Sequence, residues 1–112
     1  MLPRKNRIPS YDIGALRKNG VRSSTPLFDL SVGQTHTGLF RAAIRVSARV
    51  HRHAVGRNAI KRHIRETVRL CLPRLKNDQD VLIRVIRPLP IERSIIQKSV
   101  IDALTNAGCF SA

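Results

Sequence analysis

The sequence predicts one α+β domain in which helices and strands are interspersed along the chain. Three segments alternate apolar and polar side chains with the two-residue period of a strand, and two others place apolar side chains at helical spacing. The length of 112 residues suits one hydrophobic core and not two. The chain has 21 Lys and Arg residues against 7 Asp and Glu residues, and a formal net charge of +14. This excess favours a nucleic acid or an acidic surface as the partner.

The N-terminal part of the chain is expected to contain a short helix. Residues 1–9 are basic and contain prolines, which is typical of a flexible tail. Ser10 is a candidate N-cap for a helix over residues 11–18, and Asn19 with Gly20 would end it. Extended chain is expected after that helix.

Two strands are expected in the centre of the chain. Residues 27–32 place Phe28, Leu30 and Val32 on one side, and residues 33–38 supply a hairpin-like connection. A strand over residues 40–49 would direct one set of side chains inward: Phe40, Ala42, Ile44, Val46 and Ala48. The opposite set is mostly basic: Arg41, Ala43, Arg45, Ser47 and Arg49. The predicted sheet therefore has one apolar face and one basic face.

The C-terminal part of the chain predicts a third strand and a last helix. Residues 80–87 direct Val81, Ile83 and Val85 to the core. Pro90 is a suitable first residue for the helix. Its expected buried side chains are Ile91, Ile95, Ile96, Val100, Ala103 and Leu104. The helix would end at residues 106–108, where Asn, Ala and Gly follow one another.

The most informative segment is a basic helix expected over residues 53–72, which stops at Pro73. One row at i, i+4 spacing is cationic: Arg57, Lys61, Arg65 and Arg69, with Arg62 beside it. A second row is apolar: Ile60, Ile64, Val68 and Cys71. Like charges at this spacing destabilise a free helix by about 0.2–0.5 kcal/mol per pair. Since Glu66 is the only acid between residues 41 and 76, we expect a partner to supply the counter-charge, and a polyphosphate fits best.

Several classes of nucleic-acid-binding protein fit the sequence poorly. A helix-turn-helix motif needs two adjacent helices, whereas strands flank the basic helix on both sides. Binders of single-stranded RNA usually expose aromatic rings, whereas Phe28 and Phe40 lie on the inward phase of their strands. The mode of binding that still fits is recognition of the phosphates and the shape of a structured RNA.

Catalytic, metal-binding and membrane roles are also disfavoured. The seven acids are scattered, and only Asp78 and Asp80 are close together, at a position where a turn or capping role is expected. The histidines, Cys71 and Cys109 form no metal-ligand or redox spacing, so Cys71 is expected to lie in the core of the basic helix. The sequence contains no candidate membrane span and no apolar signal segment, which indicates a cytoplasmic protein.

Residues 57–66, with the sequence Arg-Asn-Ala-Ile-Lys-Arg-His-Ile-Arg-Glu, closely resemble a known signature. It is that of the protein subunit of bacterial ribonuclease P, which usually reads R-N-R-I-K-R-x-x-R-E. Residues 41–49 resemble that family's strand of the form R-x-G-h-x-V-S-K-K, where h is apolar, and residues 26–28 resemble the start of its first strand. Residues 80–83 and the terminal helix also occupy the expected places, so the resemblance covers nearly the whole chain.

The resemblance implies a fold, a function and partners. The implied fold is α+β, a two-layer α/β sandwich of the ribosomal protein S5 domain 2-like type. It has a mixed four-stranded sheet and three helices in the order αβββαβα, with a left-handed βαβ crossover. A protein of this family binds the catalytic RNA subunit and the 5′ leader of precursor tRNA, and assists removal of the leader by the RNA. The resemblance implies no catalytic residue and no cofactor on the protein alone, Mg²⁺ held through the RNA subunit, no membrane, and no obligate protein partner.

Position by position, the resemblance also implies two sets of RNA contacts within a single RNA-binding domain over residues 1–112. The set on the basic helix would bind the RNA subunit: Arg57, Asn58, Lys61, Arg62, Arg65 and Arg69. The other set would lie near the leader: Arg17, Ser31, Arg41, Arg45, Ser47 and Arg49. The alternatives for single residues are a solvated face for each arginine and a capping or loop amide for Asn58.

The sequence departs from the family pattern at several positions. Ala59 stands at a motif arginine, and Ala48 stands at a usual lysine. Ile13, Arg17 and Ser31 stand where relatives often carry aromatic residues that meet the leader, so we expect leader binding through charge more than through stacking. The alternative function is that of a ribosomal or other structural RNA-binding protein, which would share the charge and is compatible with the fold.

Overall fold

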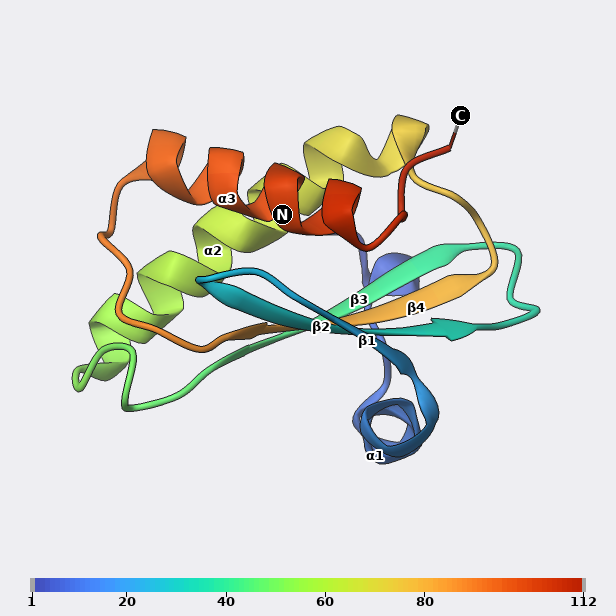
Figure 1. The fold of residues 1–112 in the computed structure, drawn as a ribbon, viewed down its shortest axis with the longest axis horizontal. Helices are drawn as coiled ribbons and strands as arrows, with labels where there is room; N and C mark the ends of the chain where they lie inside the picture. Colours follow the sequence, from blue (N-terminus) through green and yellow to red (C-terminus); the bar gives the residue numbers. More distant parts are fainter. Residues whose placement is uncertain (1, 112) are drawn as a thin grey trace.

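The computed structural model describes residues 2–111 and consists of a four-stranded mixed sheet with helices on both faces (Figure 1). The helices are α1 (Ser10–Asn19), α2 (Ala54–Cys71) and α3 (Arg93–Asn106), with short 3-10 helices η1 (Arg4–Asn6) and η2 (Leu72–Arg74). The strands are β1 (Val21–Ser24), β2 (Phe28–Gln34), β3 (Phe40–Val46) and β4 (Gln79–Val85). The α+β class and the order αβββαβα are those expected. Among the described residues, no helix is long and apolar enough to cross a membrane.

The strands lie in the order β1-β2-β4-β3, so β4 is inserted between β2 and β3. β2 pairs antiparallel with β1 and β4, whereas β3 and β4 are parallel and are connected through α2. The expected hairpin-like connection at residues 33–38 is therefore wrong. β4 takes the central place because it is apolar enough to be buried on both faces. The hairpin is formed by β1 and β2, where the Thr25 N–H donates to the Phe28 carbonyl at 2.8 Å.

The first face of the sheet packs against α2 and α3 and forms the main core (Figure 1). Its fully buried side chains include Phe28, Leu30, Val81, Ile60, Ile64, Val68, Ile96 and Leu104. Apart from Ala48, the apolar alternation predicted the strand residues of this face correctly. Ile91 and Ile95 were expected to be buried but are 45% and 38% exposed. Ile91 precedes α3, which begins at Arg93 and not at Pro90, and Ile95 lies outside the buried row of α3, which is Ile96, Val100, Ala103 and Leu104. Ala48 is exposed as well, since β3 ends at Val46.

The second face of the sheet carries α1, which lies beneath the sheet in Figure 1. Ile13 and Leu16 of α1 pack with Ile8 on the fully buried Leu82 of β4. This face is therefore not the continuous basic surface that the alternation predicts. The expected N-cap is also wrong, because the N-cap position is held by Pro9 and Ser10 is already the first residue of α1. The helix ends before Gly20, as expected.

The N-terminal segment, residues 2–8, packs along the free edge of β3. The Leu2 side chain is 1% exposed in the main core. The Asn6 side-chain amide donates to the Phe40 carbonyl at 2.7 Å, and the Ile8 N–H donates to the Ala42 carbonyl at 3.1 Å. The expectation of a flexible tail therefore does not hold for these residues. Three side chains of this basic segment are buried, those of Leu2, Asn6 and Ile8. Its hydrogen bonds cover part of a strand edge that would otherwise be unpaired.

Candidate RNA-binding surface

Helix α2 separates an apolar face from a cationic face, as its two rows of side chains predict. Ile60, Ile64 and Val68 are fully buried, and Cys71 lies in the same core. The helix begins after His53, whose backbone is extended. Because the apolar row is fixed against the rest of the core, the cationic row is directed to solvent.

Three cations of this exposed face have no acidic partner within residues 2–111. Arg62 is exposed and Lys61 and Arg65 are half-buried, and none of them forms an ion pair there. Arg69 differs, because its guanidinium pairs with Glu66 and holds the pKa of that carboxyl well below its usual range. The predicted row is therefore present, but its last member already has a counter-charge.

Arg57 organises the start of α2. Its Nη1 donates to the backbone carbonyls of His51 at 2.9 Å and Arg52 at 3.0 Å. The His51 imidazole also lies so close to Gly56 that a Cβ there would stand 2.3 Å from its Nδ1. In turn, the His53 N–H donates to His51 Nδ1 at 3.2 Å. Arg57 thus fixes the preceding loop in addition to carrying charge.

Three shallow hollows follow one another from α2 to the sheet. The first has a volume of about 380 Å³ and is lined by Asn58, Arg62, Arg65 and Glu66. The second, of about 270 Å³, has Arg7, Arg45, Lys61 and Arg65 among its lining residues. The third, of about 330 Å³, includes Arg45, Ser47, Arg49 and Arg84. Arg65 borders the first two hollows and Arg45 the last two, so they form one continuous surface, which we call the basic track.

The residues that the sequence assigned to the leader do not all lie on this surface. Arg45, Ser47 and Arg49 are exposed and line the third hollow. Arg17 is exposed on α1, outside the three hollows. Ser31 is only 2% exposed, because the face of β2 that carries it is covered. Asn58 lies in the second turn of α2, exposed, and is therefore not the helix cap.

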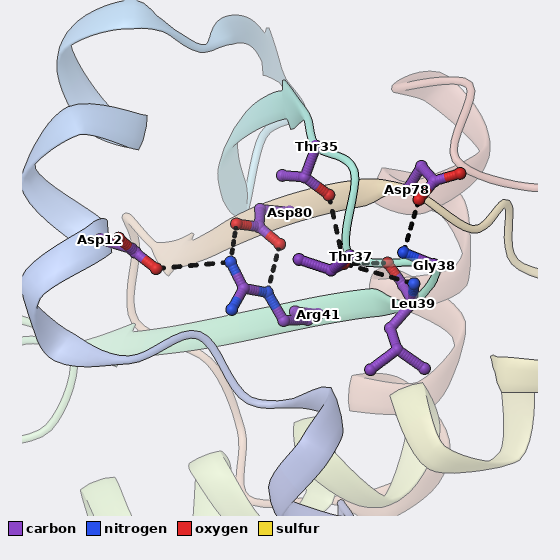
Figure 2. Close-up of polar contacts among 8 residues, drawn as sticks. All are labelled: Asp12, Thr35, Thr37, Gly38, Leu39, Arg41, Asp78 and Asp80. Carbon is purple, nitrogen blue, oxygen red and sulfur yellow. Dashed lines mark hydrogen bonds and ion pairs between the residues drawn. The ribbon is translucent and has the colours of Figure 1, made fainter.

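Arg41 is held in an ion-pair cluster and is not part of the basic track. Its Nε and Nη2 donate to the two carboxylate oxygens of Asp80 at 2.8 and 2.7 Å, and Asp12 of α1 lies 3.5 Å from Nη2 (Figure 2). The bond with Asp80 raises the pKa of Arg41. The open face expected for Arg41, Arg45 and Arg49 together is therefore wrong for Arg41. The expected turn role holds for Asp78, whose carboxylate accepts from the Gly38 N–H at 2.6 Å, but not for Asp80.

Arg84 is a basic residue of the track that the sequence did not assign. It lies on β4 directly opposite Arg45 of β3, and it forms an ion pair with Asp29 of β2. Asp29 also accepts from Arg22 and from the Ser24 hydroxyl. Burial alone would raise the pKa of Asp29, but these donors outweigh it and lower that pKa. No local pattern could place Arg84 beside Arg45, because that position depends on the pairing of β3 with β4.

The histidines and cysteines contribute no metal-ligand set within the described chain. The rings of His51 and His53 are tilted to each other with centroids 5.8 Å apart. Residues 2–111 contain no group of three or more His, Cys, Asp or Glu side chains that could hold a metal ion. Cys71 and Cys109 are buried free thiols, and burial raises the pKa of Cys109 to about 11. Cys71 lies in the core of α2, as expected.

Comparison with known proteins identifies the family. A family model described as Ribonuclease P matches residues 2–108. The ribonuclease P protein component of Chloroflexus aurantiacus, from two strains, is 34% identical over 96 residues, covering 85% of this chain and 70% of the relative. The RNase P protein of Staphylococcus aureus has a TM-score of 0.82 and 26% identity, covering 95% of this chain and 98% of that one.

The RNase P protein of Thermotoga maritima, at 18% identity, shares the fold with a TM-score of 0.70, over 90% of this chain and 93% of that one. The matches thus define a class of small α+β proteins that belong to ribonuclease P. This chain is a member of the ribonuclease P protein-component family. The resemblance carried by residues 57–66 is confirmed at the level of the family and of the fold.

The ion pairs of Asp29 predict a pH-dependent contribution to stability. Because the pKa of Asp29 is lowered in the folded chain, its stabilising effect is present above about pH 4 and is lost as the pH falls through the folded pKa. Asp29→Asn should lower the free energy of unfolding at pH 7 by about 1–3 kcal/mol, since Arg22 and Arg84 lose a charged acceptor. Urea unfolding at pH 7 and at pH 3 should show the difference from wild type shrinking at the lower pH.

Asp102→Asn is the matched control, because Asp102 is exposed on α3 and forms no ion pair among the described residues. Its effect on the free energy of unfolding should stay within about 0.5 kcal/mol. A difference for Asp29→Asn that is the same at both pH values would contradict the assigned ion pairs.

Proposed function

We propose that this chain is the protein subunit of a bacterial ribonuclease P holoenzyme. It binds the catalytic RNA subunit through α2 and holds the 5′ leader of precursor tRNA near the sheet end of the basic track. In this way it assists the endonucleolytic removal of the leader that creates the mature tRNA 5′ end. The observation that carries the proposal is the family signature on α2, whose Lys61, Arg62 and Arg65 have no acidic partner among residues 2–111.

The α2 end of the basic track suits the backbone of a structured RNA. Lys61 and Arg65 are one helical turn apart on one face, and Arg62 and Asn58 border the same hollow as Arg65. Arginine presents a planar set of donors that matches phosphate oxygens, and an amide such as that of Asn58 both donates and accepts. These contacts position a protein on RNA without reading its sequence. Arg57 supports them indirectly by fixing the loop before α2, and Arg69 contributes less because it is paired with Glu66.

The sheet end of the basic track suits a single-stranded leader held through its phosphates. Arg45, Ser47 and Arg49 line the third hollow, and Arg17 lies on the helix that packs over the same face of the sheet. No aromatic side chain lines this hollow. Since stacking on aromatic rings is worth about 1–3 kcal/mol per base, a leader held here by charge should show little preference for particular bases.

In this proposal the chemistry belongs to the RNA subunit and its Mg²⁺ ions, and the chain contributes counter-charge and substrate positioning. Most of its carboxylates already have partners: Asp12 and Asp80 hold Arg41, Asp29 holds Arg22 and Arg84, and Glu66 holds Arg69. The protein itself is assigned no metal ligand and no catalytic residue. No membrane and no further protein partner is needed, and the expected location is the cytoplasm.

Reconstitution with a bacterial ribonuclease P RNA tests the function directly. At low Mg²⁺ and modest salt, the added chain should raise the rate of precursor tRNA cleavage at the 5′ end, because it supplies cations where the RNA lacks them. High salt should remove much of this gain. The chain alone should cleave no RNA with or without Mg²⁺. Cleavage by the chain alone, or no gain with the RNA, would contradict the proposal.

The next prediction concerns the exposed cations of α2. Replacing Lys61, Arg62 and Arg65 with Ala should weaken binding to the RNA subunit without unfolding the domain, because none of the three lies in the core. Each lost phosphate contact should reduce the slope of log affinity against log salt by about 0.7–0.9. The matched control removes three cations elsewhere, at Arg87, Arg93 and Lys98, which are exposed in and before α3. Equal losses of affinity in both triple variants would show that the effect comes from net charge alone, and would contradict a specific contact through α2.

A separate prediction concerns the leader. Replacing Arg45 and Arg49 with Ala should lower the ratio of affinities for precursor and mature tRNA in the reconstituted holoenzyme, since only the precursor has a leader to reach them. Arg41→Ala should act mainly on stability, because its guanidinium is engaged by Asp80. Binding of both tRNAs by native gel or fluorescence titration measures the ratio. An unchanged ratio in the Arg45 and Arg49 double variant would exclude a leader contact at these residues.

A further inference from the structure

The middle hollow of the basic track lies between the two ends to which the proposed function assigns RNA contacts. It lies where the N-terminal segment, the first residue of α1, the edge strand β3 and helix α2 come together. Its cations come from three separate elements: Arg7 from the N-terminal segment, Arg45 from β3, and Lys61 and Arg65 from α2. The volume of about 270 Å³ is roughly nine times the share of one water molecule in the liquid, which leaves room for a phosphate group.

The charge of the middle hollow is uncompensated by any residue that lines it. None of its lining residues is an acid. A hollow on the other side of α1 provides the contrast, because there Arg41 is accompanied by Asp12 and Asp80. Arg7 and Arg45 are exposed and Lys61 and Arg65 are half-buried, so four cations from three elements surround one acid-free hollow, and their combined field favours an external anion there.

The donors of the middle hollow are also largely unused. The Nε of Arg7 donates to the Leu2 carbonyl at 3.1 Å. Arg45, Lys61 and Arg65 form no ion pair among the described residues. Ser10 borders the hollow at the first turn of α1, where backbone N–H groups lack intrahelical acceptors. These groups add a partial positive charge beside the four cations.

Arg7 reaches this position only because the N-terminal segment is docked. Its neighbours fix it on both sides, with Asn6 bonded to the Phe40 carbonyl and Ile8 to the Ala42 carbonyl. A residue held against the edge of β3 loses little freedom when an anion binds beside it. The docked segment thus presents Arg7 in place, opposite the cations of α2.

We propose that the middle hollow binds a phosphodiester group of RNA, and that it joins the α2 end of the basic track to the sheet end. Only the identity of the RNA rests on the proposed function. The source of the phosphate is either the RNA subunit, as the α2 cations suggest, or the leader, as Arg45 suggests. A strand that follows the track meets cations without interruption, because Arg65 and Arg45 each border two successive hollows.

The sharpest test places an anion in the hollow without removing a contact of the fold. Ser10→Asp adds a carboxylate at the first turn of α1, where helix geometry favours a negative charge, so the melting temperature should be unchanged or raised. Arg7→Ala is less suitable, since it would also remove the bond to the Leu2 carbonyl. Ser10→Asn is the control for size. Ser94→Asp is the control for net charge, because it lies in the first turn of α3 and outside the hollow.

Ser10→Asp should bind RNA about tenfold more weakly than wild type, as expected for the loss of one charge-assisted phosphate contact, and both controls should stay within about twofold. Two measurements identify the source: affinity for the RNA subunit alone, and affinity of the reconstituted holoenzyme for precursor tRNAs with long and one-nucleotide leaders. A loss in the first assigns the phosphate to the RNA subunit, and a loss confined to the long leader assigns it to the leader. Wild-type affinity in both would overturn the proposal.

The same variants keep this inference separate from the proposed function. If wild-type chain stimulates cleavage and Ser10→Asp does so equally at every salt concentration, the function stands and the middle hollow is not a phosphate site. If wild-type chain fails to bind the RNA subunit, the function fails, and titration with a single-stranded oligoribonucleotide still tests the hollow. Weaker oligonucleotide binding by Ser10→Asp than by Ser10→Asn supports the site, and equal binding overturns it.

Discussion

The packing of α2 on the sheet is the constraint on which the rest of the surface depends. Ile60, Ile64 and Val68 are completely removed from solvent, and each contributes about 1.5–3 kcal/mol when buried in this way. Their burial leaves the helix one rotational setting about its axis. Lys61 and Arg65 must then face outward beside the edge of β3. Burial of the apolar face thus offsets the repulsion between the like charges on the helix. The cations are already oriented before any RNA binds.

The few acids of the chain decide which arginines already have a counter-charge. Asp80 engages Arg41 with two hydrogen bonds, and Asp29 holds Arg22 and Arg84 on the second face of the sheet. These pairs stabilise the sheet where α1 and β1 cover it. Away from them, along the α2 and β3 side, no ion pair reaches Arg45 among the described residues. The net charge of +14 is therefore distributed unevenly, with unpaired cations gathered along the α2 and β3 side.

Local patterns in the sequence predicted most elements, because each apolar alternation or helical row is fixed by one stretch of chain. The order of the strands could not be read in this way. It depends on β4 pairing with β3, a contact between residues almost forty positions apart in the chain. That pairing sets Asp80 beside Arg41, which removes Arg41 from the open face expected for it, and it sets Arg84 beside Arg45, a neighbour that no local pattern predicts. The position of a side chain differed from the expectation where the relevant neighbour was distant in sequence.

The N-terminal segment shows how such a neighbour connects folding with binding. Its composition is that of a solvated tail, yet Leu2 enters the main core and Asn6 and Ile8 bond to β3. The same segment covers an open strand edge, which limits pairing with other chains, and brings Arg7 to the middle hollow. Docking of the segment and assembly of the hollow are therefore one event. RNA that binds the hollow should in turn stabilise the docked segment, since a ligand that binds only the assembled site favours the state that contains it.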